Sequence, residues 1–133
     1  MKVLEYHHKQ IYKRSGVVKR LMELTNQGWP HDEDGSGLRQ DLGAKRNGRF
    51  FLAWIAGKIV AWAFVSKARG KLQIGVYVEH PMRRKGIGGK LCKRAKAYAK
   101  KKEKEILYDS NTTAGRRMYK GAGFKHGYYD WVH

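Results

Sequence analysis

The chain has 133 residues, a length that fits one domain, residues 1–133, with its own hydrophobic core. Its 41% apolar and 12% aromatic residues exclude a disordered chain, and 29 Lys and Arg against 11 Asp and Glu give a net charge of +18. A charge of this size indicates attraction to polyanions, which can be nucleic acid, a ribosome, an anionic membrane or a phosphorylated cofactor. No apolar run approaches the roughly 20 residues that span a bilayer, and the single cysteine, Cys92, excludes an internal disulfide framework. We therefore expect a soluble cytoplasmic domain without a membrane partner.

The first third of the chain predicts one strand and two helices. A short alternating run predicts a strand over Lys2–Tyr6. Ser15 is expected to cap a helix that ends near residues 26–28, where Asn, Gln and Gly follow its last apolar positions. Residues 31–37 predict a loop, and Leu38–Ala44 a short second helix.

The middle of the chain predicts three sequential strands. Phe50–Ile55 and Ile59–Val65 are apolar runs on either side of Ala56-Gly57-Lys58, which favours a hairpin. A second turn leads into the third strand, Leu72–Val78. Because all three runs are nearly continuous in apolar residues, we expect a central sheet that is covered on both faces.

The last part of the chain predicts helices that alternate with strands. A long basic helix is expected from about Ile87 to Lys102, with its apolar residues on one stripe. A brief strand over Ile106–Asp109, a helix from about Thr112 to Gly121 and a final strand region over 123–132 follow. The predicted order of elements is therefore β-α-α-β-β-β-α-β-α-β.

The segment between the third strand and the basic helix, Arg83-Arg84-Lys85-Gly86-Ile87-Gly88-Gly89, predicts a phosphate-binding turn. The first N–H groups of a helix have no intrahelical partner, and the helix dipole favours negative charge there. Glycines let the backbone approach a ligand closely, and Arg and Lys donate charge-assisted hydrogen bonds. A Rossmann turn is excluded because the segment follows three sequential strands, and a Walker loop because G-x-x-x-x-G-K-[ST] does not occur.

A second motif, Tyr119-Lys120-Gly121-Ala122-Gly123-Phe124, ends the following helix. With both motifs, the chain resembles the GNAT superfamily of N-acyltransferases. The family signatures are R/Q-x-x-G-x-G/A after a strand that ends in V-x-x-P, here Val78 to Gly88, and Y-x-x-x-G-F, here Tyr119 to Phe124. The resemblance implies the α/β (α+β) GNAT fold, a mixed and mostly antiparallel sheet of about six to seven strands flanked by about four helices.

The resemblance also implies acetyl-CoA, or a close acyl-CoA, as the donor, with no metal. Backbone groups of Val76, Tyr77 and Val78 would pair with the pantetheine arm as an added strand does. The pyrophosphate would lie against the backbone of the turn, formed by Arg83, Arg84, Lys85, Gly86, Ile87, Gly88 and Gly89. In the family this strand also carries a bulge and diverges from its neighbour, and Gly75 is the expected position of that kink.

The family's chemistry assigns roles to further residues. Tyr119 matches the general acid that protonates the departing thiolate, with packing near Phe124 as the structural alternative. Asn111 matches a cofactor contact and equally a helix cap. Glu33 is the candidate general base, and a water chain is the alternative. The expected acceptor site is the loop with Trp29, Asp32, Glu33 and Asp34.

Two functions remain open from the sequence. The first is an N-acetyltransferase in which a primary amine, on a small molecule or on a protein lysine or N-terminus, attacks acetyl-CoA directly. The acidic run 32–34 favours a cationic acceptor, whereas the charge of +18 favours an acceptor carried on a ribosome or nucleic acid. The second is a basic nucleic-acid- or ribosome-binding module on a catalytically weak GNAT fold, because Gln73 stands where many members carry a glutamate. Either protein would be a monomer or a homodimer.

Overall fold

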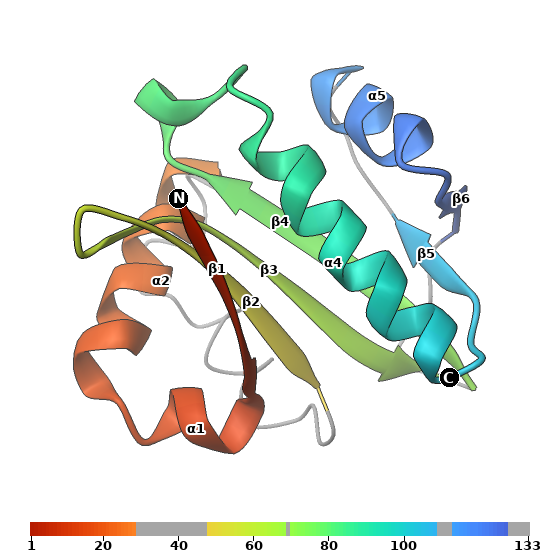
Figure 1. Cartoon of the computed structure of the whole chain (residues 1–133), viewed down its shortest axis with the longest axis horizontal. Coiled ribbons are helices and arrows are strands. Elements are labelled where there is room, and N and C mark those ends of the chain that lie inside the picture. Colours follow the sequence, from red (N-terminus) through yellow and green to blue (C-terminus); the bar gives the residue numbers. More distant parts are fainter. Residues whose placement is uncertain (29–47, 69, 109–112, 128–133) are drawn as a thin grey trace.

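The computed structural model describes residues 1–28, 48–68, 70–108 and 113–127, and within them six strands form one sheet (Figure 1). Its order follows the sequence, and the pairs from β1 to β4 are antiparallel, whereas β4–β5 and β5–β6 are parallel. The expected mixed, mostly antiparallel sheet is thus confirmed. The strands are β1 (Lys2–His7), β2 (Arg49–Ile55), β3 (Lys58–Ala68), β4 (Lys71–Val78), β5 (Ile106–Tyr108) and β6 (Lys125–His126).

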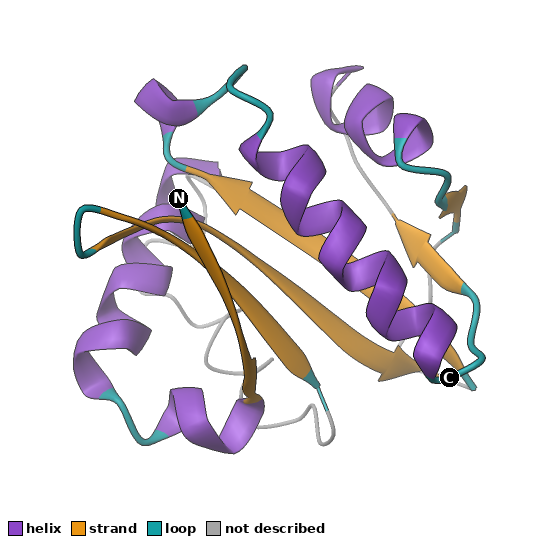
Figure 2. Ribbon diagram, viewed as in Figure 1, coloured by secondary structure: helices purple, strands orange, loops and turns teal. Residues whose placement is uncertain are grey.

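Helices cover both faces of this sheet (Figure 2). They are α1 (His8–Tyr12), α2 (Ser15–Gly28), α4 (Ile87–Lys101) and α5 (Thr113–Gly121), and a short 3₁₀ helix, η1 (His80–Met82), follows β4. None of the helices in the described ranges is long and apolar enough to cross a membrane. The predicted helix over 38–44 and the predicted strand residues beyond 127 lie outside the described residues.

The sheet buries apolar side chains on both faces because its central strands are nearly continuous in apolar residues. On one face, Phe51 packs with Leu91 and Ala95 of α4. On the other face, Trp62 packs with Leu21 of α2. All five of these side chains are less than 2% exposed, so the domain has a core layer on each side of the sheet.

The short helix α1 is an element that the sequence analysis did not predict. Its N-terminus is capped by His7, whose Nδ1 accepts from the Lys9 N–H at 3.2 Å, while Gln10 Oε1 accepts from the His7 N–H at 2.7 Å. Histidine is outside the usual set of capping residues, and five residues are too few for a helical period to show. Ser15, the expected cap of the next helix, is itself the first residue of α2.

The bulge expected at Gly75 is absent from the β3–β4 pairing. The β3–β4 register runs without a break from Ala61↔Val78 to Ala68↔Lys71. The ring of Phe64, directly across from Gly75, lies over it, and a Cβ on Gly75 would be 2.6 Å from Phe64 Cε1. Gly75 therefore makes room for an aromatic ring of the neighbouring strand, and the irregular register is instead in β2, between Ala53 and Trp54.

Candidate donor-binding and catalytic site

β4 extends beyond its described pairing with β5. Within the described residues, β5 pairs with β4 only from Leu72 to Ile74, whereas β4 continues to Val78 (Figure 1). Beyond Ile74, no described strand pairs with this edge of β4, which we call the open edge. An open strand edge presents a row of N–H and C=O groups that an extended ligand can pair with.

The backbone of β4 alternates between its two neighbours, and this alternation decides which residues face the open edge. The Leu72 N–H donates to Glu105 O at 2.8 Å on the β5 side, and the Glu79 N–H donates to Val60 O at 2.8 Å on the β3 side. Val76 and Val78 therefore direct their N–H and C=O groups to the open edge. The N–H and C=O groups of Tyr77 instead face β3. The Tyr77 ring stacks on Trp62, at 4.9 Å between centroids, on the face of the sheet that α2 covers.

Two side chains already occupy this edge. The Val76 N–H donates to the hydroxyl of Tyr119 at 3.0 Å, and Arg83 Nε donates to the Val78 carbonyl at 3.2 Å. Tyr119 and Arg83 belong to the two separate sequence motifs, so the fold brings these motifs together at one strand edge. Tyr77, in contrast, is not part of this arrangement.

Tyr119 is held rigidly in the core. Its side chain is 5% exposed, its ring stacks on Tyr108 at 4.9 Å between centroids, and Phe124 lies at 6.2 Å. Burial raises the pKa of the hydroxyl well above its usual value, the neighbouring Cys92 adds to this rise, and the Val76 hydrogen bond opposes it. The hydroxyl therefore stays protonated at neutral pH, and it accepts from Val76 in a way that leaves its own proton available for donation. The packing contacts of the structural alternative are present, and the general-acid role of Tyr119 stays a prediction.

The turn that follows η1 has the geometry expected of an anion-binding helix start. Gly86 is the N-cap of α4 and adopts φ 77°, which favours glycine, and no side chain caps the helix. The first turn of α4 contains no acidic residue, and Arg83, Arg84, Lys85 and Gly86 are exposed. An exposed helix N-terminus next to three cationic side chains attracts a phosphate group.

Gly88 and Gly89 have different surroundings within the same turn. Gly88 is buried, and a Cβ there would collide with Met118 Sδ of α5 and come within 3.7 Å of Val78 Cγ2. A Cβ on Gly89 would meet no atom within 4 Å. Gly88 therefore allows α4, α5 and β4 to approach one another, whereas Ile87, at 5% exposure, anchors the helix in the core.

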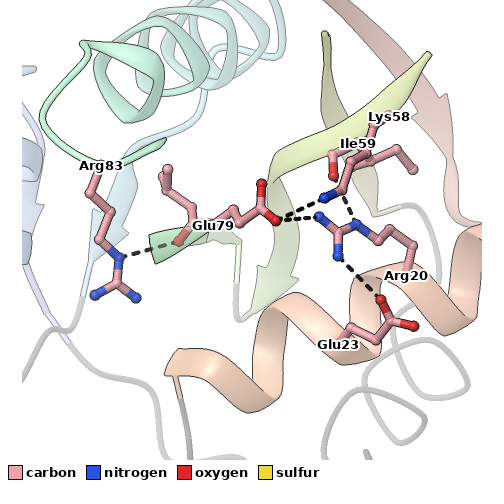
Figure 3. Close-up of polar contacts among 7 residues, drawn as sticks. Arg20, Glu23, Lys58, Ile59, Glu79 and Arg83 are labelled. Carbon is pink, nitrogen blue, oxygen red and sulfur yellow. Dashed lines mark hydrogen bonds and ion pairs between the residues drawn. The ribbon is translucent and has the colours of Figure 1, made fainter. Parts of the chain in front are cut away.

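Glu79 directly follows β4, and one oxygen of its carboxylate forms ion pairs with two cationic side chains (Figure 3). Its Oε1 accepts from Arg20 Nη2 and from Lys58 Nζ, both at 3.0 Å. The hydrogen bond from Lys58, together with Arg20, holds the pKa of Glu79 below its usual range despite some desolvation. A carboxylate stabilised in this way is a weak base. The sequence analysis missed this cluster because pairing between residues 59 positions apart leaves no local pattern.

Several predicted site residues lie outside the described residues. These are Trp29, Asp32, Glu33, Asp34 and Asn111. Cys92 is free and fully buried, and burial raises its pKa to about 12. Among the described residues, no group of three or more His, Cys, Asp or Glu side chains is arranged to hold a metal ion.

Comparisons with known proteins agree with this geometry. A family model described as "Acetyltransferase (GNAT) family" matches residues 12–124, and no curated protein sequence matches the chain. One similar structure is an aminoglycoside 6'-N-acetyltransferase, AAC(6')-IG from Acinetobacter haemolyticus, at 21% identity and a TM-score of 0.72, covering 98% of this chain and 94% of that one. A second is the aminoglycoside N-acetyltransferase AAC(6')-Iy in complex with CoA, at 16% identity and a TM-score of 0.70, covering 97% and 90%.

A third similar structure is a ribosomal-protein-alanine N-acetyltransferase from Brucella melitensis, at 13% identity and a TM-score of 0.69, covering 92% of this chain and 83% of that one. At these identities the structures show a shared fold, and the family model, which spans most of the chain, shows the family. The chain belongs to the acetyltransferase (GNAT) family and is an acyl-CoA-dependent acetyltransferase.

Proposed function

We propose that this protein transfers the acetyl group of acetyl-CoA to a primary amine, with the donor lying along the open edge of β4. The observation that carries this proposal is the Val76 N–H on that edge, held 3.0 Å from the hydroxyl of the buried Tyr119. In the proposed complex, the pantetheine arm pairs with the carbonyl groups of Val76 and Val78 as an added strand does, while the Val76 N–H stays bonded to Tyr119. The pyrophosphate lies at the N-terminus of α4, against residues 83–89, with Arg83, Arg84 and Lys85 as cationic partners.

The proposed reaction is direct attack of the neutral amine on the thioester carbonyl. The Val78 N–H, on the open edge, is the donor that stabilises the negative charge on the carbonyl oxygen. When the C–S bond breaks, the Tyr119 hydroxyl gives its proton to the departing thiolate, and the amine nitrogen gives up one proton as the amide forms. The tyrosine is then reprotonated from solvent, so one proton leaves the amine and one reaches the thiol in each turnover.

The amine must lose its proton before or during attack, and the described residues limit which group can take it. Five of the 11 acidic residues lie in the described ranges: Glu5, Glu23, Glu79, Glu103 and Glu105. Of these, only Glu79 adjoins the open end of β4, and its ion pairs make it a weak base. We therefore keep Glu33 as the proposed base, with a water chain as the alternative, and Asn111 as a proposed contact to the donor.

The distribution of acidic residues in the sequence is the basis for the proposed acceptor. The run Asp32-Glu33-Asp34, next to Trp29, supplies negative charge in a chain of net charge +18 and would attract a cationic amine. Two of the similar structures are aminoglycoside acetyltransferases, and a third is a ribosomal-protein-alanine acetyltransferase, so both small and protein amines are used within this fold. We propose a cationic primary amine in the cytoplasm as the acceptor.

The basic surface suggests a second, independent association. α4 contains no Asp or Glu, and Lys90, Lys93, Lys100 and Lys101 are exposed along it. Because the helix crosses the outside of the sheet, this surface is open to solvent (Figure 1). We propose that it recruits a ribosome or another nucleic acid, with an affinity that falls steeply as salt is raised.

The amine acceptor can be tested with a panel of small amines and peptides incubated with acetyl-CoA and analysed by mass spectrometry. Acetylation of a cationic amine that weakens when Asp32 and Asp34 are both replaced by Asn would support the proposal. Undiminished acetylation in that variant would show that the acidic run 32–34 is not part of the acceptor site. Acetyl-CoA that stays intact with every amine would contradict the acetyltransferase function itself.

A further inference from the structure

Glu79 is fixed to the rest of the fold through its N–H, its C=O and one oxygen of its carboxylate. Its N–H donates to Val60 O at 2.8 Å, and its C=O accepts from the Met82 N–H at 2.8 Å. Its carboxylate, 15% exposed, accepts from Arg20 and Lys58, each at 3.0 Å. A residue held at its N–H, its C=O and its side chain has little freedom to move.

Because of its position in the chain, Glu79 controls how the backbone leaves the sheet. It lies between the end of β4 at Val78 and the start of η1 at His80, and η1 leads directly into the turn at Arg83. The bond from Met82 to Glu79 closes the single turn of η1. The direction in which the chain leaves the sheet toward the phosphate-binding turn is therefore set at Glu79.

The partners of the carboxylate come from two other parts of the fold. Arg20 lies on α2, and its guanidinium also donates to Ile59 O at 2.9 Å and to Glu23 at 3.2 Å (Figure 3). Lys58 opens β3 at the β2–β3 hairpin. The helix and the hairpin are thereby both joined to the connection that carries the turn.

The turn itself lacks comparable support. Arg83, Arg84, Lys85 and Gly86 are exposed, and Arg84 adopts φ 64°, a left-handed conformation that is unusual outside glycine. The Arg83 side chain is tethered to the Val78 carbonyl and its N–H to the His80 carbonyl, and both partners lie on the same connection. The geometry of the exposed turn therefore depends on how its base is held.

We propose that Glu79 is a positioning residue for donor binding: through Arg20 and Lys58 it fixes the base of the turn that receives the pyrophosphate of the donor. The proposal rests on the proposed function, because it assumes that the turn binds this group. Glu79 does not touch the donor and takes no proton from the acceptor. Its effect is confined to the part of the donor that the turn contacts.

A positioning residue should affect only those donors that carry a pyrophosphate, whereas a residue with a purely structural role would affect all donors alike. Two probes are compared, acetyl-CoA and S-acetylpantetheine, which has the same thioester and pantetheine arm but no pyrophosphate. Their dissociation constants are measured by calorimetry or NMR titration for the wild-type chain, for Glu79→Gln and for Glu23→Gln. Glu23 is the matched control, because it is the other carboxylate on Arg20, is 50% exposed and lies away from the turn.

Glu79→Gln keeps the shape of the side chain and removes the charge that holds two cations. We expect the dissociation constant for acetyl-CoA to rise about tenfold or more, since charge-assisted hydrogen bonds are lost from the base of the turn. The value for S-acetylpantetheine should stay within about twofold, as should both values in Glu23→Gln. If Glu79→Gln folds poorly, Lys58→Met changes a half-exposed partner and should show the same pattern with a rise of about two- to threefold.

The outcomes separate the inference from the proposed function. Equal weakening of both probes in Glu79→Gln, or no weakening of acetyl-CoA, would overturn the positioning role while leaving the acetyltransferase intact. A wild-type chain that binds neither probe would overturn the donor site and, with it, this inference.

Discussion

Replacement of Tyr119 by Phe tests the proposed general acid with a minimal change to the fold. The ring is buried and stacks on Tyr108, and phenylalanine keeps that ring. The substitution removes the hydroxyl that accepts from the Val76 N–H, so one buried donor loses its partner. The expected cost in folding free energy is about 1–3 kcal/mol, which a thermal melt would report as a modest shift.

The catalytic effect should be larger than the structural one. Loss of a positioned general acid lowers kcat by about 100- to 10,000-fold, equivalent to roughly 3–5 kcal/mol of transition-state stabilisation. KM for acetyl-CoA should change little, because the hydroxyl acts on the departing sulfur. The assay is steady-state release of free CoA thiol at saturating amine, for the wild-type chain, for Tyr119→Phe and for Tyr98→Phe. Tyr98 is the matched control, a half-buried tyrosine of α4 that packs edge-on against Phe51.

A donor with a better leaving group distinguishes acid catalysis by Tyr119 from a structural effect of its hydroxyl. An acetyl thioester of an acidic aryl thiol needs no proton at its sulfur, so the defect of Tyr119→Phe relative to wild type should shrink with such a donor. A variant that keeps kcat within about threefold of wild type would refute the acid role, since that is less than 1 kcal/mol. A defect of the same size with both donors would indicate that the hydroxyl acts through structure alone.

The remaining predictions concern the turn, the buried thiol and the basic helix. Gly86→Val forces a branched side chain into φ 77° and should weaken acetyl-CoA binding about tenfold or more in calorimetry, whereas Gly70→Val, at φ 80° in the turn between β3 and β4, should lower the melting temperature without this effect. The Cys92 thiol, with its pKa raised to about 12, should react with a thiol reagent near pH 8 roughly a thousandfold more slowly in the native than in the denatured chain; rapid native labelling would contradict its burial. Replacing Lys93 and Lys100 by Glu should weaken RNA retention in a filter-binding assay and make it less dependent on salt, while acetyl-CoA binding stays unchanged. RNA retention equal to that of the wild-type chain would exclude α4 as the surface that binds polyanions.

The sequence predicted those parts of the fold that depend on local patterns. The three apolar runs around the hairpin at Gly57 became β2, β3 and β4, and the basic stretch after Gly86 became α4, which begins at Ile87 as expected. Hydrophobic periodicity and glycine placement decide these elements within a few residues of chain. The short α1 escaped prediction because its cap, His7, is an unusual one.

The candidate site was predictable where its motifs are contiguous and unpredictable where it depends on distant contacts. The motifs indicated both the turn and Tyr119, but the direction of each backbone group on β4 required the sheet, which separates Val76 and Val78 from Tyr77. The expectation for Gly75 failed because the ring that fills its space belongs to the neighbouring strand. The pairing of Arg20 with Glu79 likewise arises only when α2 packs against the end of β4.

Acetyl-CoA is proposed to lie along the open edge of β4 with its pyrophosphate at the start of α4. An amide NMR titration of the chain with acetyl-CoA is the direct test of this arrangement. We expect saturable shifts that are largest for the Val76 and Val78 amides and for residues 83–89, with smaller changes for Tyr77, whose amide faces β3. Saturable shifts that cluster elsewhere on the chain, or an unchanged spectrum at saturating donor, would contradict it.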